Sequence, residues 1–437
     1  MRIEIKNKKK FTTMFNKMYN NIAIETINGI AIDSRKVMPN DIFFPIKGKN
    51  YDGHDFINNA ISIGAICFSE KKTNTNKIIY TKSIIKEINS ICKKWKKLSK
   101  AKIIGITGSN GKTTTKDLLH HIFKNKYSTS KTIGNFNSLI GFPISFLSTG
   151  LNDDFCILEY GASKPHEIKD LCEIINPDYS FITNISEAHI ENFKSFKELF
   201  NTKIDLYKYT SDNGICFINT DNISIDKVKL KSNTIIFSLK NKPSIVFSKN
   251  KNYLKINDIH IHIPNHLIHI VDNILAAYII SKKFKINSKD INKSIESFNL
   301  PNGRGNIINF SNHNLIDDSY NANPSSVRLA INRINNINIK GKKILILGDM
   351  LELGKDSIGE HKKIASEIRK STIDVILTYG KLSKHINKNI TQSKYSKHYT
   401  SKDKLRIDLN NITCENDLIY IKGSRGMQLE KIYLNTL

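Results

Sequence analysis

The stretch GITGSNGKTTT, residues 105–115, holds three glycines and a lysine directly after an apolar run. It is close to the phosphate-loop pattern G-x-x-x-x-G-K-[ST], but Ile106 stands at the first glycine position, and the nearest glycine, Gly105, comes one residue earlier. Closely spaced glycines expose backbone amides that can bind phosphate oxygens at the start of a helix. The stretch therefore predicts a strand, a nucleotide-binding loop and a helix, with Lys112 on the phosphates and Thr113 on Mg²⁺.

Apolar segments that predict strands alternate with segments that predict helices on both sides of this loop. The predicted strands are KIIGIT (102–107), FCILEY (155–160), YSFITNI (179–185) and GICFINT (214–220). This order favours a mostly parallel sheet with helices on both faces. After the turn-rich LPNGRGN (300–306) the alternation begins again, which indicates a second α/β unit.

We therefore expect an α/β protein of three domains, since 437 residues exceed the size of one ordinary core. The expected domains are a small α/β domain at 1–98, a central domain with a P-loop-type sheet at 99–299, and a Rossmann-like domain at 300–437.

The net charge of +27 raises the question of nucleic-acid binding, but the composition does not favour it. Only eight of the 67 basic residues are arginine, and the lysines are scattered along the chain. A surface that reads phosphates and bases would more often use arginine. We expect no nucleic-acid partner.

Other features of the sequence limit where the protein works. Six cysteines without a C-x-x-C pair favour a reduced chain. No apolar run of about 18 residues occurs, and no apolar segment of a secretory signal follows the basic start. We expect a cytoplasmic monomer that does not insert into a membrane.

Two polar residues follow neighbouring predicted strands and could form a metal site. Glu159 ends one strand, and His189 follows the next. The carboxyl ends of parallel strands meet at one sheet edge, where ligands commonly bind.

A competing zinc site would use the four histidines of HIHIPNHLIH (260–269), but no cysteine lies beside them.

The glycine spacing G-x-x-G-x-x-G-K-T-T resembles the loop of the Mur ligase family, whose members join an amino acid or peptide to a carboxylate through ATP. LEYGASKPHEI and ITNISEAHIENF are similar to the family patterns E-x-G-A and T-N-I-x-x-A-H. The resemblance implies that ATP binds to the central domain and that the third domain closes on the bound ATP. The implied nucleotide contacts are Gly108, Ser109, Asn110, Gly111, Lys112, Thr113, Thr114, Asn273, Arg304 and Asp318.

The resemblance also implies two Mg²⁺ ions. Their ligands would be Thr113, Glu159, His189 and a carbamylated Lys203. The chain departs from the family at two places: Lys203 is followed by Ile-Asp where Gly-Glu is usual, and only His269 and Asn273 remain of the adenine-contacting motif.

The N-terminal stretch IDSRKVMPNDIFFPIKGKNYDGHDFI resembles the family's uridine-binding domain. The loop GNFNSLIGFP (134–143) resembles its contact with the sugar nucleotide. The implied substrate contacts are Ser34, Arg35, Lys47, Asp52, Gly53, His54, Asn135, Asn137 and Ser138.

Four further stretches are similar to the family members that add D-alanyl-D-alanine to UDP-N-acetylmuramoyl-tripeptide. They are SYNANP, LGDMLELG, GEHKKIA and KGSRGMQLEKI. The third domain would then bind the dipeptide, with Asn321, Asp349, Glu352 and His361 as substrate contacts. We expect catalysis through an acyl phosphate with Lys112, Lys203, Arg304 and His189 as catalytic residues. His361 is a candidate for positioning the attacking amine or accepting its proton.

Three alternatives remain open from the sequence. Another amide ligase, such as one that adds glutamate to folate, would lack the N-terminal domain. A switch protein that hydrolyses ATP would carry an aspartate at a strand end, where this chain has Glu159. The altered adenine motif leaves open a relic without activity.

Overall fold

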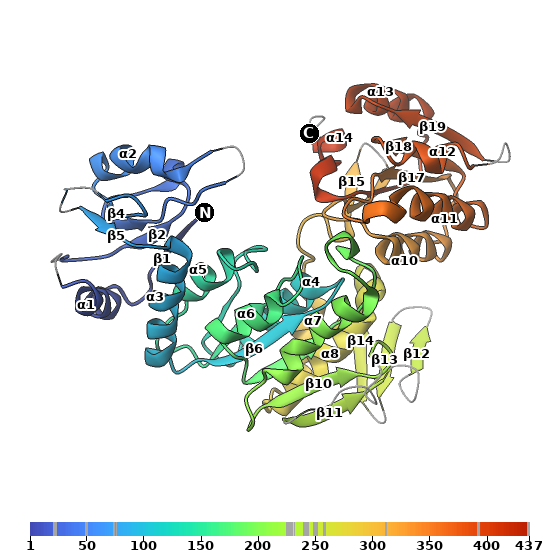
Figure 1. Cartoon of the computed structure of the whole chain (residues 1–437). Coiled ribbons are helices and arrows are strands. Elements are labelled where there is room, and N and C mark those ends of the chain that lie inside the picture. The colour runs from blue at the N-terminus through green and yellow to red at the C-terminus, as the bar shows by residue number, and fades with distance from the viewer. Residues whose placement is uncertain are drawn as a thin grey trace.

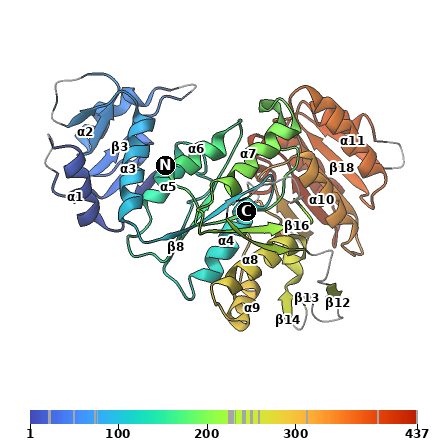
Figure 2. The ribbon, with the colours of Figure 1, turned by 60° about the horizontal axis from the view of Figure 1, so that its bottom comes forward.

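The computed structural model describes residues 1–437 except 21–23, 49–50, 73–74, 76, 224–229, 231, 239–243, 248–251, 257–258, 311–312, 391–393 and 435–437. Its described part forms three α/β units in a row (Figure 1). Both views place the N-terminal unit and the C-terminal unit at opposite ends of the central one (Figure 2). The expected class of fold is therefore confirmed.

The N-terminal unit holds a five-stranded sheet in the order β1-β2-β3-β4-β5, in which only β1 runs antiparallel to its neighbour. Its strands are β1 (Arg2–Glu4), β2 (Gly29–Ala31), β3 (Asp41–Phe43), β4 (Ile66–Ser69) and β5 (Ile78–Tyr80). Its helices are α1 (Lys8–Met18), α2 (Ile57–Ser62) and α3 (Ile84–Leu98). Helix α3 leads into the central unit, where its buried Trp95 donates a hydrogen bond to the carbonyl of Thr149.

The central unit is built on a six-stranded parallel sheet in the order β11-β10-β9-β6-β8-β7. Its strands are β6 (Lys102–Thr107), β7 (Thr129–Lys131), β8 (Phe155–Glu159), β9 (Tyr179–Ile182), β10 (Ile215–Asn219) and β11 (Asn233–Phe237). Its helices are α4 (Lys112–Phe123), α5 (Gly141–Leu147), α6 (Glu167–Ile174), α7 (Phe196–Lys208), α8 (Val271–Lys283) and α9 (Ser288–Glu296). A separate antiparallel sheet consists of β12 (Ser244–Phe247), β13 (Asn252–Ile256) and β14 (Ile259–Ile263).

Apolar residues on both faces bury the central sheet. Alternate residues of a strand point to opposite faces, so Ile103 packs into one hydrophobic core and Ile104 into another. Strand β8 follows the same rule, with Cys156 on the first face and Ile157 on the second. Such near-continuous apolar strands are typical of parallel sheets covered on both sides.

The C-terminal unit holds a six-stranded sheet in the order β15-β16-β20-β17-β18-β19, in which only β15 is antiparallel. Its strands are β15 (Asn306–Phe310), β16 (His313–Asp318), β17 (Lys343–Gly348), β18 (Val375–Tyr379), β19 (Tyr395–Tyr399) and β20 (Leu418–Lys422). Its helices are α10 (Pro324–Asn335), α11 (Ser357–Arg369), α12 (Lys384–Asn387), α13 (Lys402–Ile412) and α14 (Lys431–Leu434).

None of the helices in the described part of the chain has the length and apolar character needed to cross a membrane.

Candidate active site

The glycine loop joins β6 to α4, as the sequence predicts. Gly108 has a φ of +145°, and a Cβ placed on it would lie 1.9 Å from the hydroxyl oxygen of Thr183. This position therefore requires glycine. Gly105 serves another purpose, since it lies within β6 and a Cβ there would lie 2.9 Å from the Cβ of Pro177. The glycine that departs from the usual pattern is thus a packing residue of the strand.

Lys112 begins α4 and bends back over its own loop. Its amine donates hydrogen bonds to the carbonyls of Gly108 (2.8 Å) and Ser109 (3.3 Å). Burial lowers the pKa of Lys112, and the nearby carboxylate of Glu159 opposes that shift. The amine is therefore held by carbonyl oxygens of the loop.

Glu159 and Thr113 meet beside the loop. The buried carboxylate of Glu159 accepts a hydrogen bond from the Thr113 hydroxyl (2.9 Å) and another from the Asn137 side-chain amide (2.7 Å). Within the described ranges, Glu159 has no cationic side chain within ion-pair distance. A buried carboxylate without such a partner suits a divalent cation.

Lys203 lies on α7, beneath the same loop. Its side chain is 1% exposed, and its amine lies 3.4 Å from the carbonyl of Gly108. Burial, together with repulsion from Lys112, lowers the pKa of Lys203 to about 7. A substantial fraction of this amine is therefore uncharged at neutral pH.

His189 pairs with Glu352, which belongs to the C-terminal unit. The imidazole Nδ1 contacts the Glu352 carboxylate, and this pairing lowers the pKa of Glu352. Both residues have positive φ, 59° at His189 and 65° at Glu352. The backbone N–H of Glu191 also contacts the carbonyl of Glu352 at 3.5 Å. These contacts bring the two units together beside the loop.

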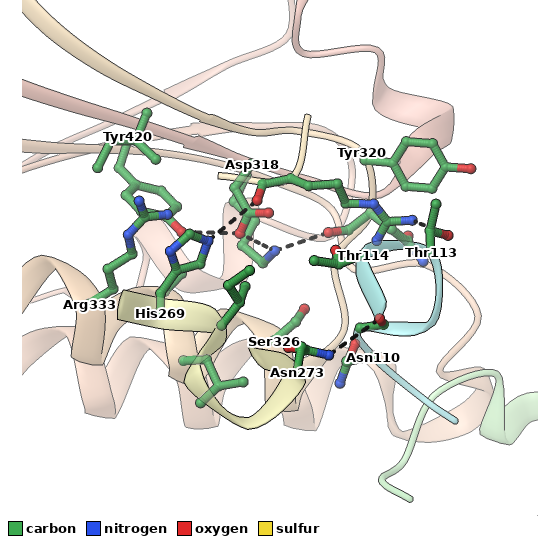
Figure 3. A pocket seen from close by; sticks show the side chains of 18 of the residues that line it. Asn110, Thr113, Thr114, His269, Asn273, Asp318, Tyr320, Ser326, Arg333 and Tyr420 are labelled. Atoms are coloured by element: carbon green, nitrogen blue, oxygen red, sulfur yellow. Dashed lines mark hydrogen bonds and ion pairs between the residues drawn. The ribbon is translucent and has the colours of Figure 1, made fainter. Parts of the chain in front are cut away.

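Arg304 reaches the loop from the start of the C-terminal unit. Its guanidinium donates to the Thr113 hydroxyl at 3.5 Å and stacks on the ring of Tyr320 at 3.8 Å. A second contact between the units joins the side chains of Asn323 and Asn110 at 2.8 Å. Figure 3 shows Tyr320 beside Thr113 at one end of this region.

Asp318 lies at the end of β16 with two neighbours from β20. Its Oδ2 accepts hydrogen bonds from the amine of Lys422 (2.6 Å) and the hydroxyl of Tyr420 (3.1 Å). Lys422 also donates to the carbonyl of Asn321 (3.1 Å). In Figure 3, Asp318 lies between Tyr420 and Tyr320.

One cavity of about 1030 Å³ connects these residues. It lies between the central and C-terminal units, and both contribute to its walls. The predicted site residues that line it are Ser109, Asn110, Gly111, Lys112, Thr113, Thr114, Asn135, Asn137, Glu159, His189, Asn273, Arg304, Asp318, Asn321 and Glu352. Gly108 and Lys203 lie directly behind this wall, since Lys112 and Lys203 both approach the Gly108 carbonyl.

Asn273 supports the loop from α8. Its side-chain amide donates to the Thr115 hydroxyl (2.7 Å) and to the carbonyl of Gly111 (3.4 Å). This residue therefore holds the loop in place as well as lining the cavity.

Two predicted substrate residues, Asp349 and His361, are buried and bonded to backbone groups. Asp349 is buried, and its carboxylate accepts backbone N–H bonds from three consecutive residues, Lys381, Leu382 and Ser383. His361 is also buried, with Nδ1 on the carbonyl of Ser357 (2.6 Å) and Nε2 on the N–H of Met350 (3.1 Å). Both ring nitrogens are thus occupied.

Burial lowers the pKa of His361, and neither it nor Asp349 lines the cavity. In this structure the bonds of Asp349 and His361 hold the loop after β17. Their roles as substrate contacts, and the role of His361 in positioning the amine or accepting its proton, stay predictions.

The predicted uridine contacts lie in the N-terminal unit, outside this cavity. Asp52 caps a short 3₁₀ turn (Gly53–Phe56) by accepting bonds from the His54 backbone N–H (3.0 Å) and ring Nδ1 (2.7 Å). Lys47 pairs with Asp52 in an isolated β-bridge. Ser34 and Arg35 form a second 3₁₀ turn, where Arg35 pairs with Asp33 at 2.9 Å.

Ser138 lies in the loop before α5, where its hydroxyl accepts the backbone N–H of Gly141 at 3.5 Å. The competing zinc site is not formed, because no group of three or more metal-binding side chains of His, Cys, Asp or Glu occurs in the part of the chain that the structure describes.

Sequence reasoning missed Tyr320, Lys422 and Arg425 as cavity residues. They stand inside SYNANP and KGSRGM, which the sequence singled out only as stretches. The available signal was that SYNANP directly follows the apolar strand β16 and that KGSRGM begins at the last residue of β20.

Comparison with protein families gives three matches along the chain. Residues 26–101 match the Mur ligase family catalytic domain, residues 106–281 the Mur ligase middle domain, and residues 303–425 the Mur ligase glutamate ligase domain.

Relatives that align with nearly the whole chain are named as ligases. The chain is 32% identical over 422 residues to the UDP-N-acetylmuramoyl-tripeptide--D-alanyl-D-alanine ligase of Bacillus subtilis (strain 168), which covers 93% of this chain and 92% of that protein. It is 33% identical over 428 residues to the ligase of the same name from Buchnera aphidicola subsp. Acyrthosiphon pisum (strain APS), with 93% and 92% covered.

Among solved structures, MurF ligase from Thermotoga maritima in complex with ADP superposes with a TM-score of 0.81 at 25% identity, covering 92% of this chain and 95% of that one. MurF from Acinetobacter baumannii shares the fold, with a TM-score of 0.87 at 23% identity and 97% and 98% covered. The chain belongs to the Mur ligase family.

Proposed function

We propose that this protein is an ATP-dependent ligase that joins D-alanyl-D-alanine to UDP-N-acetylmuramoyl-tripeptide, with ADP and phosphate as further products. The observation that carries this proposal is the reach of Arg304 across the cavity to Thr113 of the glycine loop. The Bacillus and Buchnera ligases named for this reaction align with nearly the whole chain. The product is a precursor of peptidoglycan.

Each unit has its own task in this proposal. The N-terminal domain, residues 1–98, binds the uridine end of the acceptor through Ser34, Arg35, Lys47, Asp52, Gly53 and His54. The central domain, 99–299, binds ATP, and Asn135, Asn137 and Ser138 contact the acceptor's sugar. The C-terminal domain, 300–437, closes on ATP and binds the dipeptide. The protein works as a cytoplasmic monomer.

The triphosphate of ATP lies on the glycine loop at the start of α4, where backbone N–H groups and the helix dipole favour negative charge. Lys112 moves from the loop carbonyls to the phosphates. Both hydrogen bonds to Asp318 within the described residues use Oδ2, which leaves Oδ1 to accept a ribose hydroxyl.

The residues around Glu159 fit Mg²⁺, because a buried carboxylate and the Thr113 hydroxyl already adjoin there. A second ion would use His189 and a carbamylated Lys203. Carbamylation adds CO₂ to an uncharged amine with loss of a proton, and the pKa of about 7 at Lys203 supplies that amine. Bound Mg²⁺ neutralises the phosphate charge that builds up during transfer.

The reaction proceeds in two steps. The terminal carboxylate of the tripeptide attacks the γ-phosphoryl group of ATP, ADP leaves, and an acyl phosphate forms. The uncharged amine of D-alanyl-D-alanine then attacks the acyl carbon, and phosphate leaves from the tetrahedral intermediate. Lys112 and Arg304 oppose the negative charge in both steps, so the protein acts by positioning and electrostatics.

A direct assay tests the proposal. The protein is incubated with ATP, Mg²⁺, UDP-N-acetylmuramoyl-tripeptide and D-alanyl-D-alanine, and phosphate and the pentapeptide product are both measured. Equal amounts of the two are expected. Phosphate without pentapeptide would favour an ATP-hydrolysing switch protein, and neither product would favour a relic.

The same assay tests the glycine loop. Lys112→Ala is expected to lower the rate of both products by about 10²–10³, since it removes a charge that stabilises the transferring phosphoryl group. Lys124→Ala, at the end of the same helix, is the matched control and should keep the rate. Full activity of Lys112→Ala would refute the assignment of the loop.

A further inference from the structure

The following inference rests on the proposed function, in which D-alanyl-D-alanine is the incoming substrate. This dipeptide carries a charged group at each end. Its amine must be uncharged when it attacks, but its terminal carboxylate stays ionised throughout. A carboxylate that enters a partly enclosed cavity needs a cation or several N–H donors. One such partner is a cation about one dipeptide length from the reacting carbon.

Five cationic side chains line the cavity among the described residues: Lys112, Arg304, Arg333, Lys422 and Arg425. Lys112 and Arg304 lie at the glycine loop, where the phosphates react. The Lys422 side chain is 3% exposed and already paired with Asp318.

Arg333 is excluded by its position. Its guanidinium donates to the carbonyl of Gly305 (3.1 Å) and lies 5.8 Å from the ring of Tyr420. Figure 3 shows Arg333, His269 and Tyr420 at the end of the cavity away from Thr113. This leaves Arg425 among the described cavity cations.

Arg425 and Arg304 both lie near the ring of Tyr320. The guanidinium carbon of Arg425 lies 5.9 Å from the ring centre of Tyr320, and that of Arg304 lies 3.8 Å from the same centre. The two guanidinium groups are therefore no further apart than the sum of these distances. Two extended residues span at most roughly 7 Å, and this length lies within that upper limit.

A neighbouring acid orients Arg425 without covering it. NH1 of its guanidinium donates to Oε1 of Glu430 at 2.7 Å, while the Arg425 side chain stays 60% exposed. An arginine has five N–H donors, so one bond to Glu430 leaves others for a second carboxylate.

We propose that Arg425 binds the terminal carboxylate of the dipeptide and selects substrates that carry one. Both guanidinium groups lie near the ring of Tyr320, which limits the distance between the two charge-binding points. The segment KGSRGM is then a specificity element for the incoming amine substrate.

The test compares D-alanyl-D-alanine with D-alanyl-D-alaninamide, which keeps the amine but has no carboxylate. The unaltered protein is expected to prefer the acid by roughly 10²-fold in kcat/KM, because a site built for a polar group rejects an analogue that lacks it. Equal kcat/KM for the two substrates would overturn the proposal without any variant being made.

Arg425→Gln provides the second arm. It should raise the KM for D-alanyl-D-alanine by roughly 10- to 100-fold, leave the KM for ATP unchanged, and bring the preference for acid over amide close to one. Arg406→Gln, which removes an arginine paired with Asp403 on α13, is the matched control and should keep the preference.

An unchanged preference in Arg425→Gln would refute the role of Arg425, even though the protein is a ligase. If the unaltered protein forms no pentapeptide at all, the proposed function itself fails, which is a different result.

Discussion

At the scale of single residues, Lys203 shows how position decides chemistry. A lysine on a helix is ordinarily solvated and charged. Here the side chain is 1% exposed, and burial with the neighbouring Lys112 lowers the pKa of its amine to about 7. The same residue type at Lys208, five residues further along α7, is exposed and pairs with Asp205.

The carbamylation of Lys203 can be tested by chemical rescue. If Lys203 carries the proposed carbamate, Lys203→Ala is expected to lower kcat by about 10²-fold or more, because it removes that carboxylate-like group from the site. Acetate with bicarbonate should restore part of the rate by supplying a carboxylate in the space left. Lys208→Ala should keep full activity. If no short-chain acid restores Lys203→Ala at any concentration, the carbamate is unsupported.

At the scale of elements, helix α4 joins the nucleotide loop to a packed core. Its first residue is Lys112, and further along Leu118 and Leu119 pack under the sheet. His120 is on the same helix, with Nε2 3.2 Å from the carbonyl of Thr129. Burial, followed by the charge of Lys131, lowers the pKa of His120 to about 4.

This shift predicts how stability depends on pH. The folded state holds His120 uncharged, whereas the unfolded chain takes up a proton near pH 6.5. The contribution of His120 to stability is therefore complete above about pH 6.5 and is lost as the pH falls towards 4.

Urea unfolding at several pH values checks this prediction. His120→Gln keeps a donor for the carbonyl of Thr129. Between pH 6.5 and 4 it should lower the slope of the unfolding free energy against pH by the amount that corresponds to about one bound proton. His166→Asn, at an exposed position directly before α6, is the control. Identical slopes for His120→Gln and the unaltered protein would contradict the assignment.

At the scale of the whole molecule, the site exists only where two domains meet. Arg304 contacts Thr113, Asn323 contacts Asn110, and Glu352 contacts His189. All three contacts join the C-terminal unit to the glycine loop or to the strand end beside it. Closure of the two units would exclude water from the acyl phosphate.

Small-angle X-ray scattering tests this closure. A non-hydrolysable ATP analogue with the tripeptide substrate should lower the radius of gyration, because the ligands add contacts on both sides of the cavity. Glu352→Ala should weaken that response by removing one contact between the units. Identical scattering curves with and without the ligands would argue against closure.

Fifteen of the residues that line the cavity were predicted, several of them only through the resemblance to the Mur ligase family. The sequence by itself determined the order of strands and helices around the glycine loop and the position of that loop. These features depend on local patterns: apolar runs that fill a parallel sheet, glycines at positive φ and polar residues at strand ends. Glu159 could be placed for this reason, since a strand end faces the sheet edge wherever the strand lies.

Only the tertiary structure decided which side chains face the cavity. Asp349 and His361 stand in stretches singled out by the sequence, yet both are buried and bonded to backbone groups. Arg304 meets Thr113 across 191 positions of sequence. Local patterns cannot specify such contacts, because these contacts arise where two domains pack together. The residues at a domain interface do not recur at a regular spacing along the sequence. Packing within single units has the same effect: it places Arg425 near Tyr320 in the C-terminal unit and lowers the pKa of Lys203 in the central unit.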